Sequence, residues 1–477
     1  MTPKPQRIRD PVHNLVEFNI SDQLERTLWA VIQTPPFQRL RRIRQLGFSE
    51  FVFPGATHTR FAHSIGVFHI ARMLVQVIKR QGASGGQPFL DRQAQVALAA
   101  ALVHDVGHGM FSHAFEAIGT QLNLPMAHHE RVSAALIRDS ELTVALNKEL
   151  GRGFADDVAT LVGQKGPGSL YDAVVSSQFD ADRLDYMQRD RLMTGVQSSG
   201  IDLTWLLANL EIRPVRTGAD DDPGEEIQTL VLGPKAVQTA ESYVLSLFHL
   251  YPNVYLHKTT RGAEAMFTAL MRRLLRLGAD GHDGTGLPRN HPILRFAREP
   301  GSLDCAKALD DLVFWGALPM LAEAADKGIA RLATGLMNRG LPVCTDLRQR
   351  VDEAMPRVPD EPRDRRQARV ALACTRIEAA LRARDDGEHD GVDRVMFDRY
   401  DRAPYKRYDN SDTPLNRILI RTGDGPPTDM AESSPVVAGA ETFSVRRVYT
   451  FRGDEAAKRV VENIIRTEIR RVTDADT

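Results

Sequence analysis

Hydrophobic residues recur three and four positions apart over much of the first half of the chain, a spacing typical of amphipathic helices. The spacing predicts helices in LERTLWAVIQ, FQRLRRIRQLG, AHSIGVFHIARMLVQVIKRQG and RQAQVALAAALVHDVG. Pro35 and Pro36 stand between the first two stretches, and proline is accepted only in the first turn of a helix. The pattern therefore predicts a helix stop and a restart at this point, a loop over QGASGGQP, and a further helix over about 235–248.

Two other stretches alternate between hydrophobic and polar residues, as strands with one buried face do. LEIRPVRT and EIQTLVLG flank an acidic turn, which predicts a β-hairpin near residues 210–232. TFSVRRVYTF predicts a strand near residues 442–451, and DEAAKRVVENIIRTEIRRV after it predicts an amphipathic helix. The expected fold class is mainly α, with a small β-hairpin and a mixed C-terminal region.

The character of the sequence changes after Leu277. GADGHDGTGLPRNHP is rich in glycine, MPRVPDEPRDRRQAR is charged and contains proline, and TGDGPPTDMAESSPVVAG has the composition of a flexible segment. We therefore expect a core domain over residues 1–276 and an accessory or assembly region over residues 277–477.

Composition narrows the class of protein. The chain has 477 residues, 42% hydrophobic and 26% charged, with a formal net charge of −1, so no overall basic field favours non-specific binding of nucleic acid. Three widely spaced cysteines do not make a disulfide framework and fit a reducing compartment. No apolar run approaches the about 20 residues of a membrane span. We expect a cytoplasmic protein with no signal peptide and no contact with a membrane.

The candidate chemistry begins with ALVHDVGHGMFSH, which carries three of the fourteen histidines and an aspartate. His104 and His108 are four positions apart and would share one face if the helix continued through them, with Asp105 beside them. Imidazole and carboxylate groups together suit manganese, iron, cobalt or zinc. For an isolated His-Asp pair, a histidine at a helix end with a capping aspartate would be the commoner explanation.

Other motifs accompany this pair. HTRFAHSIGVFH places Arg60 three positions before a histidine, FDADRLDYMQRD spaces acidic and phenolic side chains at four-residue steps, and MAHHERV adds His128 and His129. Any one of these could be an ordinary solvated helix face. Considered together, two histidines and two aspartates from three helices form a candidate metal shell that leaves positions open for water or phosphate oxygen. The candidate ligands are His63, His104, Asp105 and Asp182.

With these motifs the chain resembles the HD-superfamily phosphohydrolases, and most closely the deoxynucleoside triphosphate (dNTP) triphosphohydrolases, which include bacterial dGTPases and a human dNTPase with SAM and HD domains. The similarity runs through RDPVHNLVEF, TPPFQRLRRIRQLGFSEFVFPGATHTRFAHSIGV, LVHDVGHGMFSHAFE, HHE and FDADRLDYMQRD, and it fades after VYLHKTTRGAEAMF. The resemblance implies the helical HD fold and hydrolysis of a phosphate ester or anhydride.

The resemblance also implies roles for individual residues. The four candidate ligands match the family's metal ligands, which implies a divalent transition metal (Mn, Fe, Zn, Co or Ni), with Mg accompanying the triphosphate. Glu116 stands where relatives often carry an aspartate that supports a histidine, so its side chain is one methylene longer. The residues that match active-site positions are His108, His113, Glu116 and His129. The residues that match phosphate positions are Arg60, Arg183 and Tyr255, and those around the deoxyribose are Gln45, Leu46, Tyr186 and Asp190.

The implied reaction releases a nucleoside and intact tripolyphosphate. The metal would hold the α-phosphate and lower the pKa of a water, while Arg60 and Arg183 balance charge on the phosphoryl oxygens. The leaving 5′-oxygen needs a proton, and His113 is the candidate donor. Leu46 would crowd a 2′-hydroxyl, which favours deoxyribose.

The resemblance further implies a homo-oligomer, dimer or tetramer, with a nucleotide activator site between subunits. Gln38, Arg41, His257 and Lys258 match that site, whereas Gln33 stands where the human member has an aspartate that recognises guanine, and Arg9 replaces an asparagine. Because an amide both donates and accepts hydrogen bonds, guanine is no longer singled out.

Two other functions stay open. The same fold could act on ATP, a modified nucleotide, an alarmone or a cyclic dinucleotide, because fold does not determine substrate. The chain could also bind nucleic acid or sense nucleotides with only vestigial hydrolysis. The basic stretches FQRLRRIRQ and MRRLLR could contact phosphates, but an ordinary amphipathic helix surface is the favoured explanation for them.

Overall fold

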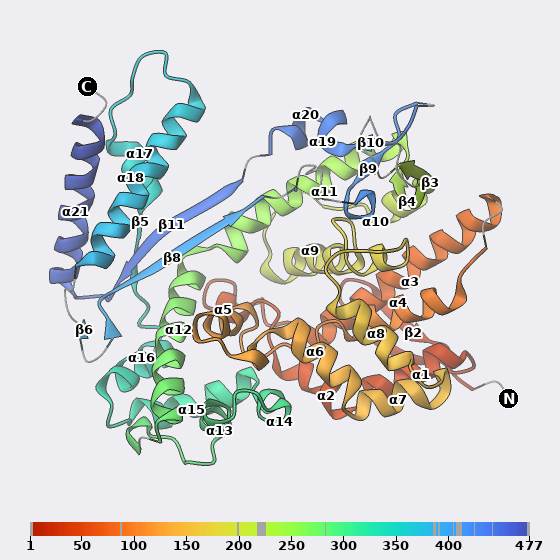
Figure 1. The fold of residues 1–477 in the computed structure, drawn as a ribbon, viewed down its shortest axis with the longest axis horizontal. Coiled ribbons are helices and arrows are strands. Elements are labelled where there is room, and N and C mark those ends of the chain that lie inside the picture. The colour runs from red at the N-terminus through yellow and green to blue at the C-terminus, as the bar shows by residue number, and fades with distance from the viewer. Residues whose placement is uncertain are drawn as a thin grey trace. The chain divides into compact units, whose positions relative to one another are not determined.

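The computed structural model describes residues 3–85, 88–197, 200–216, 226–281, 283–384, 388–389, 392–403, 405–406, 413–423, 425–440 and 442–474. It is mainly helical with small sheets, which confirms the predicted fold class (Figure 1). The chain forms two compact units, and each draws on separate stretches of the sequence. Unit 1 contains residues 1–255, 299–314 and 403–441, and unit 2 contains residues 256–298, 315–402 and 442–477.

Unit 1 carries all the motifs in which we located candidate catalytic and metal-binding residues. Its helices are α1 (Gln23–Ile32), α2 (Pro35–Gln38), α3 (Arg60–Gly85), α4 (Asp91–Val103), α5 (His113–Leu122), α6 (His129–Arg138), α7 (Glu141–Leu150), α8 (Phe154–Gly163), α9 (Ala181–Thr194), α10 (Leu203–Ala208), α11 (Val237–Leu250), α14 (Leu303–Lys307), α19 (Met430–Ser433) and α20 (Pro435–Ala438). Its strands are β1 (Gln6–Asp10), β2 (Asn14–Phe18), β3 (Leu210–Arg216), β4 (Glu226–Leu232), β9 (Leu419–Ile420) and β10 (Thr428–Asp429).

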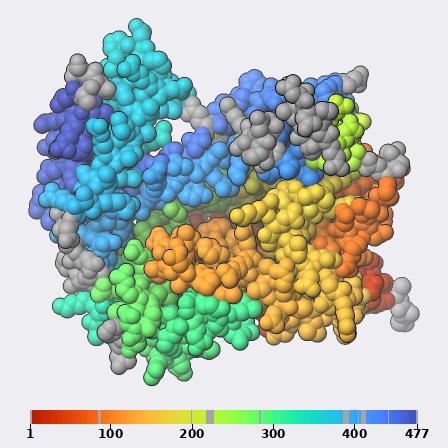
Figure 2. Space-filling model, in the orientation of Figure 1, coloured from red at the N-terminus to blue at the C-terminus, as the bar shows by residue number. Residues whose placement is uncertain are grey.

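The centre of unit 1 is α3, which packs against α4 and α9. Phe68, Leu102 and Leu184, one from each helix, are fully buried. Helices α6, α7 and α8 pack on one another and present one surface of the unit, coloured orange to yellow in Figure 2. Between Arg60 and Ala83, α3 is long and apolar enough to cross a membrane, but 72% of its apolar 18-residue stretch is buried in the protein, as in a core helix.

Two short sheets complete unit 1. Strands β1 and β2 pair antiparallel, with Gln6 opposite Phe18. The predicted hairpin is confirmed, because β3 and β4 pair antiparallel with Leu210 opposite Leu232, inside a sheet of order β10-β9-β4-β3. Its acidic turn, residues 217–225, lies outside the described residues.

Unit 2 contains the helices α12 (Lys258–Ala279), α13 (Pro292–Arg298), α16 (Lys327–Met337), α17 (Leu347–Ala354), α18 (Arg363–Ala383) and α21 (Glu455–Asp474) and the strands β5 (Val343–Asp346), β6 (Glu388–His389), β7 (Val392–Asp393), β8 (Val395–Arg402) and β11 (Phe443–Thr450). Helix α15 (Asp311–Ala322) begins in unit 1 and continues in unit 2. The predicted C-terminal strand and helix are confirmed as β11 and α21. The apolar faces of α17, α18 and α21 meet β11 around Val351, Ile377, Val448 and Ile465.

Three sequence predictions need correction. The helix expected through FQRLRRIRQLG is α2 followed by a 3-10 turn over Arg39–Arg42, after which Ile43 is extended. The buried Arg39 side chain donates to the carbonyls of His108 and Leu309, both at 2.6 Å, so tertiary hydrogen bonds override the helical spacing. Helix α3 continues to Gly85, so the loop expected from Gln81 begins later.

The third correction concerns the histidine motif. Helix α4 ends at Val103, and His104 is its C-terminal cap, so His104 and His108 do not share a helix face. The predicted division at residue 276 stays a prediction, and the two compact units each combine separate stretches of the chain.

Candidate metal and phosphate site

The site is built from the first turn of α3, the end of α4 and the first turn of α9. Helix α3 begins at Arg60, so Arg60 and His63 lie on its first turn and both are buried. His104 and Asp105 directly follow α4, and Asp182 lies in the first turn of α9 behind the Asp180 cap, whose carboxylate accepts from the backbone N–H of Arg183 at 2.8 Å. Three helix ends therefore bring together side chains that lie far apart in the sequence.

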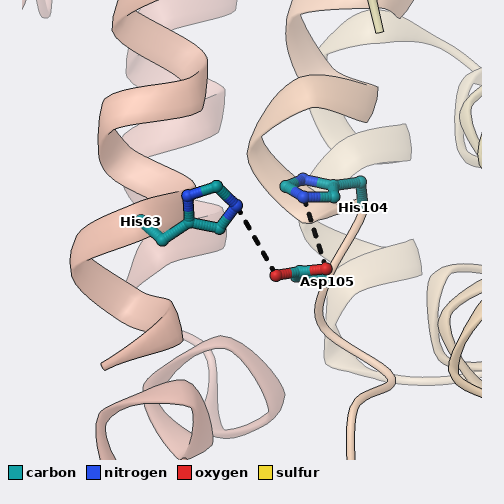
Figure 3. A group of neighbouring side chains, drawn as sticks. All are labelled: His63, His104 and Asp105. Atoms are coloured by element: carbon teal, nitrogen blue, oxygen red, sulfur yellow. Dashed lines mark ion pairs between the residues drawn. The ribbon is translucent and has the colours of Figure 1, made fainter. Parts of the chain in front are cut away.

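The four predicted metal ligands converge on one place. His63, His104 and Asp105 offer ligand atoms that all lie within 4.8 Å of one another (Figure 3). A carboxylate oxygen of Asp182 lies 2.9 Å from Nε2 of His63 and 3.8 Å from Nε2 of His104. The Asp182 side chain is 36% exposed, so this side of the group is reached by solvent.

The donor set fits a divalent transition metal. Nε2 of His63 and Nε2 of His104 are both buried, and neither makes a hydrogen bond of regular geometry with a described residue. Each faces carboxylate oxygens instead, Asp182 at 2.9 Å from His63 and Asp105 at 3.3 Å from His104. Buried nitrogen atoms without a well-formed hydrogen bond are costly unless something binds them. Two imidazole nitrogens beside two carboxylates are ligands for manganese, iron, cobalt or zinc.

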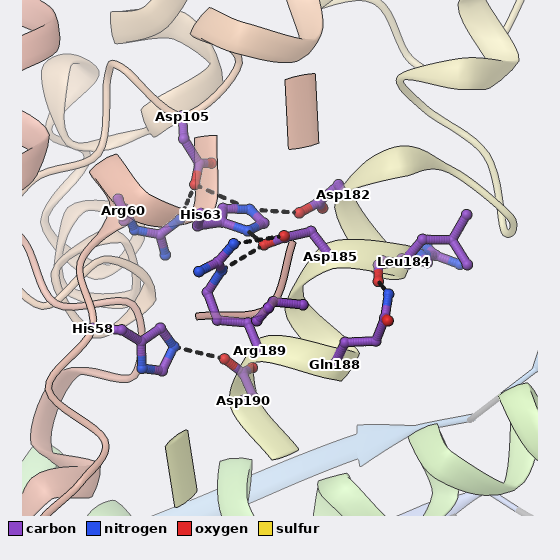
Figure 4. Close-up of polar contacts among 12 residues, drawn as sticks. His58, Arg60, His63, Asp105, Asp182, Leu184, Asp185, Gln188, Arg189 and Asp190 are labelled. Atoms are coloured by element: carbon purple, nitrogen blue, oxygen red, sulfur yellow. Dashed lines mark hydrogen bonds and ion pairs between the residues drawn. The ribbon is translucent and has the colours of Figure 1, made fainter. Parts of the chain in front are cut away.

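A buried layer behind His63 determines which of its nitrogens faces the site. Nδ1 of His63 lies 2.8 Å from the Asp185 carboxylate, which leaves Nε2 directed at Asp105 and Asp182 (Figure 4). Asp185 also accepts two hydrogen bonds from Arg189, both at 2.8 Å, and lies 2.7 Å from Nε2 of His13. A carboxylate behind a ligating histidine orients the ring and raises its basicity.

Sequence reasoning missed Asp185 and His13 as parts of the site. His13 follows β1, and Asp10 at the end of that strand accepts from Arg189 at 2.7 Å. Asp185 stands in the quoted FDADRLDYMQRD motif, but its spacing does not reveal that it faces His63 from the neighbouring helix. The only available signal was the general need of a metal-binding histidine for a second partner.

A second cluster lies beside the metal ligands. Nδ1 of His113 lies 2.7 Å from one oxygen of Glu116, and Nδ1 of His129 is hydrogen-bonded to the other oxygen. The backbone N–H of His129 donates to Glu116 at 2.8 Å. The longer glutamate therefore reaches two histidines at once.

His108 joins this cluster to the candidate metal ligands. Its ring stacks on that of His129 with centroids 3.9 Å apart, and its Nε2 lies 3.1 Å from Asp105. His108 and His129 are largely buried, whereas the His113 side chain is 75% exposed. His113 is thus the member of the cluster that is open to a substrate.

The protonation states within the cluster differ. Burial tends to raise the pKa of Glu116, but the hydrogen bonds from His113 and His129 prevail and hold it well below its ordinary value. Burial alone would lower the pKa of His129, yet its bond to Glu116 raises it. Burial, with Arg60 and His129 nearby, holds the pKa of His108 well below its ordinary value. Glu116 and His129 form an ion pair, while the stacked His108 stays neutral.

The two predicted phosphate-binding arginines differ in their surroundings. Arg60 donates from Nη1 to Asp105 and from Nε to Ser112 Oγ, the latter at 2.7 Å. Arg183 on α9 lies 3.9 Å from the Asp180 carboxylate with its side chain 23% exposed. Arg60 is therefore fixed between two segments of the site, and Arg183 is the more accessible cation.

The predicted sugar-binding residues are brought together in part. Asp190 is buried, lies 2.8 Å from Nε2 of His58, and accepts a hydrogen bond of 2.8 Å from the Tyr255 hydroxyl. The rings of Tyr186 and Tyr255 meet edge to face with centroids 6.2 Å apart. The buried Oε1 of Gln45 accepts no hydrogen bond from a described residue. Leu46 beside it is half-buried. His58, which sequence reasoning did not single out, anchors Asp190.

The candidate activator residues fall in both units. In unit 1, Gln33 caps α1, and Arg41 donates to Gln38 at 2.8 Å while its guanidinium lies 3.5 Å from the Phe61 ring centroid. In unit 2, His257 caps α12 and Lys258 is its first residue. The complete activator set remains a prediction.

The comparisons with known proteins agree with this geometry. The family model described as HD domain matches residues 60–187, and the one described as HD associated region matches residues 225–285. The chain is 35% identical over 280 residues to the uncharacterized protein YwfO of Bacillus subtilis, a match that covers 59% of this chain and 58% of YwfO. It is 35% identical over 229 residues to the Xenopus laevis deoxynucleoside triphosphate triphosphohydrolase SAMHD1, covering 40% of this chain and 34% of that protein.

A solved structure matches most of the chain. The crystal structure of a phosphohydrolase from Bacteroides thetaiotaomicron is similar with a TM-score of 0.68 and 26% identity, and it covers 94% of this chain and 100% of that one. The chain spans between a third and about three fifths of the two relatives above. It carries an HD domain of the superfamily that includes the dNTP triphosphohydrolases, as its motifs predicted. The class of protein that fold, site and similarity support is a metal-binding phosphohydrolase.

Proposed function

We propose that this protein is a metal-dependent dNTP triphosphohydrolase, which converts a dNTP to a deoxynucleoside and tripolyphosphate. The observation that carries the proposal is the pair of buried Nε2 atoms on His63 and His104. They make no regular hydrogen bond with any described residue and face the carboxylates of Asp105 and Asp182, next to a histidine and glutamate cluster. The similarity to a relative named for this activity supports the choice of substrate.

The residues that would hold the metal are His63, His104, Asp105 and Asp182. The metal, when bound, would polarise a phosphate oxygen and make a water more acidic. Asp185 keeps the proton of His63 on Nδ1, so that Nε2 presents its lone pair.

The phosphates would be bound by arginine. Arg60 and Arg183 supply fixed positive charge where negative charge grows on the phosphoryl oxygens. Because Asp105 and Ser112 hold Arg60 in place, little reorganisation is needed when substrate binds.

His113 would donate the proton that the leaving 5′-oxygen requires. Its Nδ1 is held by Glu116, so Nε2 is the atom that carries a transferable proton, and the exposed ring can reach a substrate. The contact with Glu116 keeps the imidazole of His113 oriented for the transfer.

The sugar would bind near Asp190, which His58 and Tyr255 hold in one orientation. Tyr186 offers a ring beside Tyr255, and Leu46 would crowd a 2′-hydroxyl. Assembly into a homo-oligomer and control by a second nucleotide at Gln33, Gln38, Arg41, His257 and Lys258 belong to the same proposal.

A product assay tests the substrate. Purified protein is loaded with Mn²⁺ and incubated with each dNTP and each NTP, and the products are separated by ion-exchange chromatography, with Asp105→Ala as the inactive control. Tripolyphosphate from dNTPs but not from NTPs is the expected result. Turnover of NTPs, alarmones or cyclic dinucleotides instead would contradict the proposal in favour of another nucleotide.

A binding assay separates the remaining alternative. If no nucleotide is turned over while single-stranded nucleic acid binds with an affinity that falls steeply with salt, the protein is a nucleic-acid-binding protein. The net charge of −1 argues against that outcome.

A further inference from the structure

A buried aspartate outside the HD motifs reaches into the site. Asp311, the first residue of α15, is 1% exposed and lies 200 residues beyond the histidine loop. One carboxylate oxygen accepts from the backbone N–H of Phe111 and the other from the backbone N–H of Arg44, both at 2.8 Å. Both donors stand next to candidate site residues, because Arg44 precedes Gln45 and Leu46, and Phe111 lies two residues before His113.

The turn that Asp311 holds has an unfavourable backbone conformation. Phe111 and Ser112 are consecutive non-glycine residues with φ of 50° and 53°. Ser112 also has ψ of −115°, a combination that favours glycine. Such a conformation persists only where surrounding contacts impose it, and it is commonly found at functional sites.

Aromatic packing supports the same turn. The Phe111 ring stacks on Phe48 with centroids 4.0 Å apart and meets Phe314 edge to face at 5.2 Å. Phe314 lies on α15 one turn after Asp311. The start of α15 therefore contacts the turn twice, through the Asp311 carboxylate and through the Phe314 ring.

The strained turn connects directly to the chemistry. Ser112 Oγ accepts from Nε of Arg60 at 2.7 Å, and Arg60 reaches on to Asp105. Helix α5 begins at the next residue, His113, the candidate proton donor. If the turn relaxed to ordinary backbone angles, Ser112, which holds Arg60, and His113 at the start of α5 would both move.

We propose that Asp311 is a positioning residue, whose carboxylate joins the Phe111–Ser112 turn to the segment that carries Gln45 and Leu46 and so holds Arg60 and His113 in place. The inference depends on the proposed function in one respect, because it takes Arg60 and His113 to be residues that act on the substrate. Nothing in the HD motif itself requires an aspartate from this distant segment.

The proposed role requires the ionised form of Asp311, in which both carboxylate oxygens accept hydrogen bonds. Burial raises its pKa to about 7, with the Asp310 carboxylate adding to the rise, while the N–H groups of Arg44 and Phe111 and the charge of Arg60 oppose it. An ionised carboxylate accepts at both oxygens, whereas an asparagine amide would direct its NH₂ at one of the two N–H donors. Asp311→Asn therefore breaks one link while keeping the size of the side chain.

The matched control is the neighbouring Asp310→Asn. Asp310 is also buried at 3% exposure, but it accepts from Arg42 at 2.6 Å and from the N–H of Val313 at 3.1 Å, away from the turn. Hydrogen exchange of the peptide covering residues 105–116 is measured by mass spectrometry in the Mn-loaded wild type and in both variants, together with metal content, kcat and KM.

We expect Asp311→Asn to speed exchange in this peptide about 10-fold or more and to lower kcat about 10- to 100-fold with metal content unchanged. Asp310→Asn should leave the exchange rate of this peptide and kcat at the wild-type level, even if it lowers the melting temperature. Equal exchange in the two variants, or faster exchange in Asp311→Asn with unchanged kcat, would overturn the inference.

Two further measurements keep the test decisive. If Asp311→Asn does not fold, Asp311→Glu takes its place in the same comparison, because it keeps a carboxylate but moves it by one methylene from the N–H groups of Phe111 and Arg44. If wild-type protein cleaves no dNTP, the proposed function fails, and the role of Asp311 is judged from peptide exchange and from hydrolysis of bis(4-nitrophenyl) phosphate with Mn²⁺.

Discussion

Unit 1 contains two neighbouring groups of polar residues. The first, called the pocket below, consists of the candidate metal ligands His63, His104, Asp105 and Asp182, and the second is the cluster of His108, His113, Glu116 and His129. The histidines of the two groups differ in the hydrogen bonds that their ring nitrogens make. In the pocket, Nε2 of His63 and Nε2 of His104 make no regular hydrogen bond with a described residue. In the cluster, His113 and His129 each pair through Nδ1 with Glu116. The first arrangement presents lone pairs to a cation, and the second holds protons.

Electrostatics follow the same division. Glu116 and His129 stabilise each other's charged forms, while burial and the charges of Arg60 and His129 keep His108 neutral between the two regions. A single stretch of sequence, residues 104–116, thus supplies both candidate metal ligands and candidate proton carriers. The partner of each ring nitrogen, more than the residue type, decides which role a histidine has.

The largest effect is expected from His104→Ala. Removing one of two imidazole ligands should abolish bound metal and lower turnover about 1,000-fold or more, because a bound metal contributes several kcal/mol to transition-state stabilisation. Metal content by plasma mass spectrometry and kcat measure the two effects, and circular dichroism checks the fold. Asp105→Ala should behave in the same way.

His128→Ala is the control for this experiment. His128 is exposed and belongs to none of the groups of described residues that could hold a metal, so metal content and turnover should stay at the wild-type level. Full metal occupancy and activity in His104→Ala under metal-controlled conditions would show that the pocket is misassigned.

A smaller and different effect is expected from His113→Ala. The variant should keep its metal but lose about 100- to 10,000-fold in kcat, the range for loss of a general acid. Comparing metal content with kcat separates the cluster from the pocket. A His113→Ala protein without metal would mean that metal binding is not confined to the pocket and that the roles of the two regions are misassigned.

The smallest effect concerns stability and is read from Glu116→Gln. The pKa of Glu116 is depressed, so its contribution is present above its ordinary value of 4.5 and is lost as pH falls through its lower folded value. The pKa of His129 is raised, so its contribution is complete below 6.5 and is lost as pH rises through its folded value. Between pH 4.5 and pH 6.5 the free energy of unfolding of the wild type should therefore exceed that of Glu116→Gln by about 1–3 kcal/mol. Below and above this range the difference should be smaller.

Urea unfolding of metal-free protein near pH 3, 5.5 and 9 measures this difference. Glu130→Gln, an exposed glutamate on the same helix as His129, should show little difference at any of these pH values. A constant difference between wild type and Glu116→Gln would contradict the ion pair.

Much of the fold follows from local pattern. The hydrophobic spacing of α3, the alternation of β3, β4 and β11 and the amphipathic α21 all reflect burial of one face, which the sequence records directly. The helix predicted through FQRLRRIRQLG fails because Arg39 is bound by carbonyls of distant segments. The helix predicted in RQAQVALAAALVHDVG ends earlier than expected, at Val103, so His104 and His108 do not share a helix face.

The candidate ligands were recognised from motifs, but their supporting partners were not. These partners come from segments far away along the chain. They are Asp185, which contacts His63, His13, which contacts Asp185, His58, which contacts Asp190, and Asp311, which accepts from the N–H of Phe111. Each is a common residue type in an unremarkable local context. Which nitrogen or N–H group it meets depends on how helices pack.

The sequence by itself determined a helical protein with histidines and aspartates suited to a transition metal, because side-chain chemistry and periodicity are local properties. The tertiary structure alone decided which ring nitrogens stay without a regular hydrogen bond, which carboxylate holds two histidines, and why Phe111 and Ser112 adopt left-handed angles. Those features depend on distances between segments that only packing sets.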